Sequence, residues 1–169
     1  MRRAVAKREK PPEPTPSLAE ATPPPFDMRF AIINKIGMVD SLSAGVATRL
    51  LETLSLPAPL FGLLHLFVES PETPRTVTVL AKMMRVPQPG VTKRVQKLLQ
   101  RGLVREEASP FDARQKLLFI TPAGQELHRQ AIRLLVPAAW ELFAGWSDAE
   151  LQQMMANLER IKAALEERF

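Results

Sequence analysis

A charged segment followed directly by an apolar run offers the most distinctive chemistry in this sequence. Asp112, Arg114 and Lys116 lie at alternate positions, and the run Leu117–Ile120 follows at once. Guanidinium and ammonium groups bind phosphates and carboxylates, so this segment predicts contact with an acidic partner. The apolar run predicts a short strand that packs the charged segment onto a core.

A second group of polar side chains lies shortly before this segment. Its members carry amide, hydroxyl, ammonium or guanidinium groups; they are Gln88, Thr92, Lys93, Arg94, Gln96 and Lys97. Glutamine and threonine can hydrogen-bond to the edges of bases, whereas lysine and arginine bind phosphates as well as guanine. For the cations the sequence leaves both alternatives, base and phosphate, open.

Positive charge is concentrated in the same part of the chain. The 169 residues have a net charge of +5, yet residues 75–116 alone contain ten Lys or Arg and three Asp or Glu, a net charge of +7. The segments on either side, 26–74 and 117–169, are each slightly acidic. A local excess of this kind is typical of nucleic-acid binding. The alternative is a solvated basic face without a partner.

Two short helices are expected to position the second group of side chains. Residues 76–84 have apolar side chains at helical spacing, with Thr76 or Thr78 as the N-cap. Residues from about Pro89 to Arg101 form a second helix, because proline suits the first helical position. Gly102 is placed to end this helix in a left-handed conformation.

Two extended arms, 103–107 and 117–120, enclose the charged segment and predict a β-hairpin. A helix pair followed by such a hairpin is a winged helix-turn-helix. The second helix fits the major groove of DNA, and the hairpin reaches the neighbouring minor groove, where a guanidinium is attracted by the negative potential. Arg114 is the residue expected there, while Asp112 is expected to hold the loop in shape, for instance by pairing with an arginine.

The predicted fold is mainly α-helical with a small β-hairpin wing, and further helices flank the reading region. Thr121 and Pro122 begin a helix that Pro137 should break or kink, and Ser147 with Glu150 forms a capping box for the last helix. We expect four parts: a disordered Pro-rich basic tail at 1–25, helices including a buried apolar block (60–68) at 26–74, the winged helix-turn-helix at 75–121, and further helices at 122–169.

The sequence shows no basis for an enzyme. It has no cysteine, its two histidines are 63 positions apart, and no phosphate-cradling loop is present, so no metal site, cofactor or catalytic residue is expected. The segment "SLSAG" (41–45) lacks the first glycine of a nucleophile elbow. No unbroken apolar run is long enough to cross a bilayer, and the basic start leads into prolines; a cytoplasmic protein is expected.

The region from "TVTVLA" to "LLFITPAG" resembles the DNA-binding core of the multiple-antibiotic-resistance regulator (MarR) family. The matching pieces are "GVTKRVQKL", "RGLV" and the wing pattern of Asp112 and Arg114, with nine residues from Asp112 to Thr121. The resemblance extends over about residues 30–167. Two features depart from the family pattern: Arg94 stands at a position that is often apolar, and Pro89-Gly90 replaces small hydroxyl residues.

The resemblance implies a homodimer whose N- and C-terminal helices intertwine. Two reading helices and two wings would then bind a pseudo-palindromic operator in double-stranded DNA, usually to repress transcription. The resemblance also implies a small-molecule effector, for which we expect a pocket near Met38, Phe61 and His65. The alternative for His65 is a satisfied buried or interface histidine. The rival interpretation is a winged-helix module that binds another protein and never contacts DNA.

Overall fold

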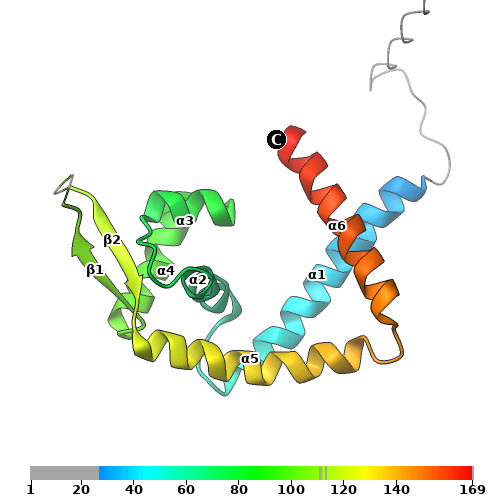
Figure 1. Cartoon of the computed structure of the whole chain (residues 1–169), viewed down its shortest axis with the longest axis horizontal. Helices are drawn as coiled ribbons and strands as arrows, with labels where there is room; N and C mark the ends of the chain where they lie inside the picture. The colour runs from blue at the N-terminus through cyan, green and yellow to red at the C-terminus, as the bar shows by residue number, and fades with distance from the viewer. Residues whose placement is uncertain (1–26, 111, 113, 169) are drawn as a thin grey trace, which may run out of the picture. The chain divides into compact units, whose positions relative to one another are not determined.

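The structure, a computed structural model, describes residues 27–110, 112 and 114–168 (Figure 1). It consists of helices and one antiparallel hairpin, which confirms the predicted fold class. The elements are α1 (Met28–Glu52), α2 (Ala58–Val68), α3 (Val77–Met84), α4 (Gln88–Gln100), β1 (Val104–Ala108), β2 (Lys116–Ile120), α5 (Pro122–Leu142) and α6 (Asp148–Arg168).

The chain divides into two compact units within α1, one ending at Ser41 and the other beginning at Leu42. In the first unit the apolar side chains of α1 are exposed; Phe30 is 71% exposed and Met38 57%. By length and composition alone α1 could cross a membrane, but a single helix of this kind is weak evidence, because helices of soluble proteins pass the same test. Lys35 and Asp40 interrupt its apolar sequence.

The core of the second unit is built around α2. Leu63, Leu64 and Phe67 are at most 1% exposed, which confirms that the apolar block is buried. Neighbouring elements contribute one to three buried side chains each: Leu80 from α3, Val91, Val95 and Leu98 from α4, Leu118 and Ile120 from β2, and Ala131 from α5. The helix pair and the hairpin are therefore fixed to the same apolar cluster.

Local capping groups set the bounds of α3 and α4. The Thr76 hydroxyl accepts the backbone N–H of Val79 at 3.3 Å, as predicted for an N-cap. Arg85 ends α3 in the left-handed region with φ of 51°, and Gly102 has φ of 66° just after α4. The second helix begins at Gln88, one residue before the expected Pro89.

The hairpin pairs Val104 with Ile120 and Ala108 with Lys116 in antiparallel register. Arg75 adds a third backbone segment, because its N–H and C=O both pair with Leu118, at 3.1 and 2.8 Å. Strand β2 thus has a hydrogen-bonded neighbour on each side, β1 on one and the backbone of Arg75 on the other.

The junction between β2 and α5 explains the segment "TPAG". The backbone N–H of Thr121 donates to the Leu103 carbonyl at 3.1 Å, and its hydroxyl donates to the Gly102 carbonyl at 2.7 Å. The same hydroxyl accepts the N–H of Gly124 at 3.1 Å, so it caps α5 as predicted. Gly124 is buried directly against the Leu103 carbonyl, which leaves no room for a side chain.

Two expectations about the C-terminal half have different outcomes. The capping box is confirmed, since the Ser147 N–H donates to Glu150 at 2.8 Å; this bond lowers the pKa of the Glu150 carboxyl. Of the two outcomes predicted for Pro137, a break is wrong, because α5 continues through it to Leu142, and a kink stays a prediction. Proline removes one hydrogen bond and crowds the preceding turn, yet this long helix retains its other bonds.

We predict that Gly124→Ala destabilises the protein by about 2 kcal/mol, the usual range for overpacking a tight site. A Cβ at this position would overlap the Leu103 carbonyl oxygen and lie 2.9 Å from Ile120 Cγ1. Denaturant unfolding measures the effect. Gly62→Ala on α2 is the control, because no atom lies within 4 Å of its added Cβ and alanine favours a helix. Equal stability of the two variants would contradict the proposed close approach.

Candidate nucleic-acid interface

Helix α4 presents a polar face opposite its buried face. Val91, Val95 and Leu98 are at most 3% exposed and fix the helix to the core. Lys93, Gln96 and Lys97 are exposed, and neither lysine has an ion-pair partner among the residues that the structure describes. These three side chains are therefore free to contact a ligand from the exposed face of the helix.

The remaining predicted contacts of α4 are less exposed or partly engaged. Thr92 and Arg94 are half-buried, and the Thr92 hydroxyl donates to the Gln88 carbonyl at 2.9 Å. Because a hydroxyl has a lone pair left after donating, Thr92 can still accept one hydrogen bond. Gln88 itself is exposed at the start of the helix.

Asp112 organises the tip of the wing through the backbone. Its carboxylate accepts the backbone N–H of Arg114 at 2.9 Å, and its carbonyl accepts the N–H of Gln115 at 2.9 Å. A further bond from the Ser109 N–H to the Gln115 carbonyl, 3.0 Å long, closes the loop. The expected role of Asp112 in shaping the loop therefore rests on a main-chain contact, and the exposed guanidinium of Arg114 has no ion-pair partner in the described part of the chain.

Several other cations of the basic region are engaged within the protein. Arg105 forms an ion pair with Glu107 and lies 4.6 Å from the centre of the Phe119 ring, and Lys116 lies 3.6 Å from Glu106. The net charge of the region could not show these ion pairs, because it includes the acidic residues of β1 without showing that they lie beside the cations.

Two arginines that sequence analysis counted in the positive charge have structural roles. Arg75 is only 9% exposed, and its guanidinium donates to the sulfur of Met83 at 3.0 Å. Arg101 donates to the Ser55 carbonyl at 2.8 Å and so ties the end of α4 to the turn after α1. Neither contact could be read from local sequence, because the partners lie on other elements.

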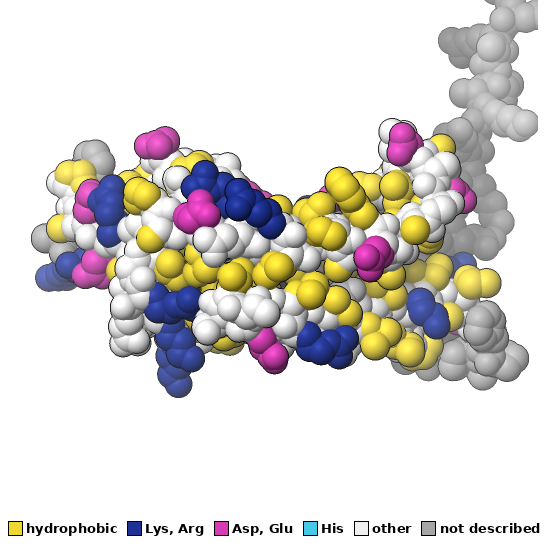
Figure 2. All heavy atoms as spheres, turned by 90° about the horizontal axis from the view of Figure 1, so that it is seen from below, with side chains coloured by type: hydrophobic (Ala, Val, Ile, Leu, Met, Phe, Trp, Pro, Cys, Tyr) yellow, Lys and Arg dark blue, Asp and Glu magenta, His cyan; other side chains and the backbone are white. Residues whose placement is uncertain are grey.

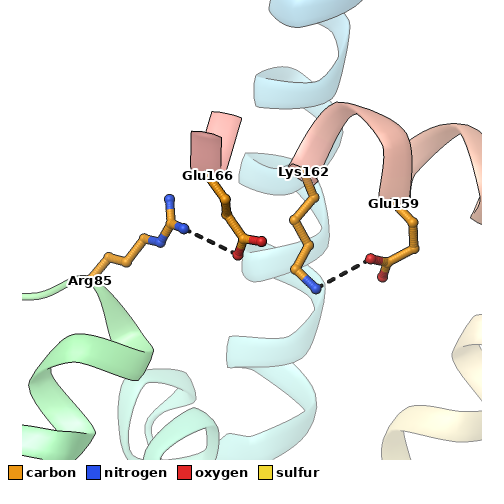
Figure 3. Close-up of polar contacts among 4 residues, drawn as sticks. All are labelled: Arg85, Glu159, Lys162 and Glu166. Atoms are coloured by element: carbon orange, nitrogen blue, oxygen red, sulfur yellow. Dashed lines mark hydrogen bonds and ion pairs between the residues drawn. The ribbon is translucent and has the colours of Figure 1, made fainter. Parts of the chain in front are cut away.

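Arg85, in the turn between α3 and α4, has an unexpected partner. Its guanidinium contacts Glu166 of α6 at 3.1 Å, and both side chains are about half exposed (Figure 3). A second ion pair, between Glu159 and Lys162 at 3.3 Å, lies on α6 itself (Figure 3). Exposed pairs of this kind contribute at most about 1 kcal/mol.

The two histidines that seemed unrelated in sequence are in contact. His65 Nδ1 lies 2.9 Å from His128 Nε2, and the Phe61 ring stacks on both imidazoles, with its centroid 5.5 Å from that of His128. His128 is buried, whereas His65 is exposed on its chain, so the prediction of a buried His65 is wrong and that of an interface His65 stays a prediction. Phe61 and His65 of the predicted effector pocket are thus neighbours; Met38 belongs to the other unit.

The described residues contain no group of three or more His, Asp or Glu side chains that could hold a metal ion. A shallow hollow of about 420 Å³ lies elsewhere, lined by Thr48, Glu52, Ser55, Leu56 and Pro57. The effector pocket near His65 stays a prediction. The exposed polar groups of α4 and the wing tip include hydrogen-bond donors and cations, a set suited to an anionic polymer.

Known proteins share this fold. Residues 54–115 match the sequence model described as the MarR family. No curated protein sequence matches the chain. The fold is similar to that of the transcriptional regulator BldR from Sulfolobus solfataricus, with 25% identity, a TM-score of 0.71, and coverage of 80% of this chain and 95% of that one.

Two similar structures contain DNA. A mutant MarR from E. coli complexed with operator DNA is 22% identical, with a TM-score of 0.68 and coverage of 80% of this chain and 99% of that one. The S. aureus MepR–DNA complex is 19% identical, with a TM-score of 0.71 and coverage of 82% and 99%. Residues 54–115 thus match the MarR family model, and the chain has the winged helix-turn-helix fold of these structures.

Proposed function

We propose that the protein is a sequence-specific, DNA-binding transcriptional repressor that acts as a homodimer in the cytoplasm. The observation that carries this proposal is a set of exposed cations on two elements of one core that have no ion pair with any described residue: Lys93 and Lys97 on α4 and Arg114 at the wing tip. The structures of MarR and MepR with DNA support it, since they have the same fold.

Helix α4 reads the major groove in this proposal. Gln88, Thr92 and Gln96 can form hydrogen bonds with base edges, and Lys93, Arg94 and Lys97 supply positive charge. The absence of small hydroxyl side chains at Pro89 and Gly90 moves base reading toward the middle of the helix. Lys97, nearer the C-terminal end, is better placed for a phosphate than for a base.

The wing supplies a second, separate contact. Asp112 fixes the backbone around Arg114, so the guanidinium can enter a minor groove with less loss of conformational freedom. Lys116 begins β2, next to the wing tip, and lies beside Glu106. If its ammonium group binds a DNA phosphate in place of the Glu106 carboxylate, Lys116 helps to position the duplex.

The dimer is proposed from exposed apolar side chains. The helices at both ends expose large side chains that water solvates poorly: Phe30, Ile33, Leu42 and Val46 on α1, Trp140 and Leu142 on α5, and Met154, Met155, Leu158 and Leu165 on α6. Figure 2 shows apolar side chains gathered on one face. Exposed large apolar side chains mark interaction surfaces, and a second copy offers the same apolar side chains.

Release by a small molecule completes the proposal. An effector that binds more tightly to a conformation unable to span both half-sites would lower operator affinity by that difference in affinity. Met38, Phe61 and His65 remain our candidates for its pocket. If the protein bound no duplex of any sequence, the alternative of a protein-interaction module would replace this proposal.

We predict that Arg114→Ala weakens binding to a selected genomic operator fragment by at least about tenfold and leaves the dimer intact, because one buried charged contact in a minor groove is lost. Fluorescence anisotropy at fixed salt measures the affinity. The control is Arg133→Ala, which removes an equal charge from the exposed surface of α5. Equal loss in both variants would reduce the role of Arg114 to its net charge.

We predict that Lys97→Ala changes the salt dependence of binding to nonspecific duplex. One phosphate contact contributes about one unit to the slope of log affinity against log salt, so the slope should become less steep by about that amount. The matched control is Lys162→Ala on α6, where the lysine already pairs with Glu159. An unchanged slope for Lys97→Ala would show that α4 does not contact the phosphate backbone through this residue.

We predict that Leu42→Glu shifts the protein from dimer to monomer. Leu42 is 69% exposed on α1, and a carboxylate buried there in a dimer would have no partner. Sedimentation velocity at several concentrations measures the change, with Ser43→Glu as the control of equal charge. A Leu42→Glu dimer as stable as the unmodified one would place the interface elsewhere.

A further inference from the structure

The contact between His65 and His128 joins two elements that the proposed DNA reading does not use directly. His65 comes from α2, at the centre of the core, and His128 from α5. The 2.9 Å separation between Nδ1 of His65 and Nε2 of His128 requires one N–H and one lone pair between the rings. At least one of the two facing nitrogens must therefore be unprotonated.

We propose that this histidine pair is a pH-sensitive contact, which holds α5 against α2 while at least one ring is neutral and loosens when both rings are protonated. In the doubly protonated state two N–H groups face each other, so the hydrogen bond is lost. Two positive charges would then lie a single hydrogen-bond length apart, beneath the apolar Phe61 ring.

The charges around the pair favour this behaviour. Glu69, one turn along α2, lies 3.8 Å from Nε2 of the exposed His65. On α5 the charged neighbours Glu126 and Arg129 pair with each other at 2.6 Å. In the described part of the chain Glu69 is the one charged side chain in contact with the pair. Among the described residues, no carboxylate contacts His128, which lies between apolar side chains and His65.

The direction of the pH effect follows from His128. Burial, and then the positive charge of protonated His65, lower the pKa of His128 below its ordinary value of 6.5. The unfolded chain therefore binds more protons than the folded chain at pH values between the lowered pKa and 6.5. The contribution to stability is complete above 6.5 and decreases as the pH falls through that interval.

The consequence for DNA rests on the proposed function. Thr121, the N-cap of α5, donates hydrogen bonds to the carbonyl groups of Gly102 and Leu103 at the base of the wing. Ala131, Leu127 and Leu135 are its apolar contacts with the core, all on the face that carries His128. Loosening of this face changes how α5 holds the wing and α4 relative to the C-terminal helix. Acidification should thus weaken operator binding, whereas added positive charge alone would strengthen it.

The composition of the chain makes the test simple. It has two histidines and no cysteine, so few other groups titrate near neutral pH. We expect imidazole resonances of the full-length protein to show one ring that titrates below 6.5. Thermal unfolding should occur at lower temperature as the pH falls from about 7.5 to about 5.5. In His128→Gln, whose amide can still bond to His65 but does not titrate, this pH dependence should disappear.

Operator affinity is measured over the same pH interval at constant ionic strength. We expect it to fall by about tenfold in the unmodified protein, within the range usual for coupling between two sites of one protein. In His128→Gln it should stay constant or increase. Glu69→Gln is the control, because it removes a neighbouring charge while leaving both imidazoles, and the direction of the pH effect should remain.

Each failure has a separate meaning. If His128 titrates at its ordinary value and unfolding does not change with pH, the proposal is wrong even when DNA binding is observed. If the pair titrates as expected but operator affinity is insensitive to pH, its regulatory role is refuted. If the protein binds no DNA at any pH, the proposed function fails, while the titration and unfolding still decide the fate of the histidine contact. Should His128→Gln not fold, His65→Gln tests the same coupling, because His128 then loses its charged neighbour and its pKa should rise.

Discussion

Burial of α2 is the constraint on which the rest of the second unit depends. This helix is apolar on nearly every side, and Leu63, Leu64 and Phe67 are almost completely inaccessible. A helix of this kind cannot remain in water, so other elements must cover it. Helices α3, α4 and α5 and strand β2 all contact it. Helix α4 and the wing are consequently attached to one apolar core.

A second constraint is that some cations of the basic region stabilise the fold, whereas others stay exposed and available for binding. Ten cations in residues 75–116 give the region its net charge of +7. Arg75 and Arg101 donate to a sulfur and a carbonyl, and Arg105 is held between Glu107 and Phe119. These side chains keep the α4–hairpin region in shape. A smaller group, including Lys93, Lys97 and Arg114, is left exposed without ion-pair partners in the described part of the chain.

Features that depend on neighbouring residues could be predicted from the sequence. Thr76 and Thr121 cap helices, Gly102 ends one, and Ser147 bonds with Glu150, because each contact spans only a few residues. The prediction of a break at Pro137 is wrong for a physical reason. Proline removes one hydrogen bond, and the other hydrogen bonds of α5 are enough to continue the helix.

Contacts between distant parts of the chain could not be predicted. His65 and His128 are 63 residues apart, and Arg85 and Glu166 are 81 apart. Nothing in either local sequence distinguishes such pairs from solvated side chains, since the fold alone brings them together. The site residues are an intermediate case. Their exposure on α4 follows from the helical period, whereas the engagement of Arg105 and Lys116 depends on strand register.

The position of Arg75 beside Leu118 has a consequence for solubility. A two-stranded hairpin has two open edges, each of which could pair with a strand of another molecule. The backbone of Arg75 occupies part of the β2 edge. The other edge, along β1, carries Arg105, Glu106 and Glu107, and charged side chains discourage edge-to-edge pairing. A wing protected in this way can extend from the protein without serving as a template for aggregation.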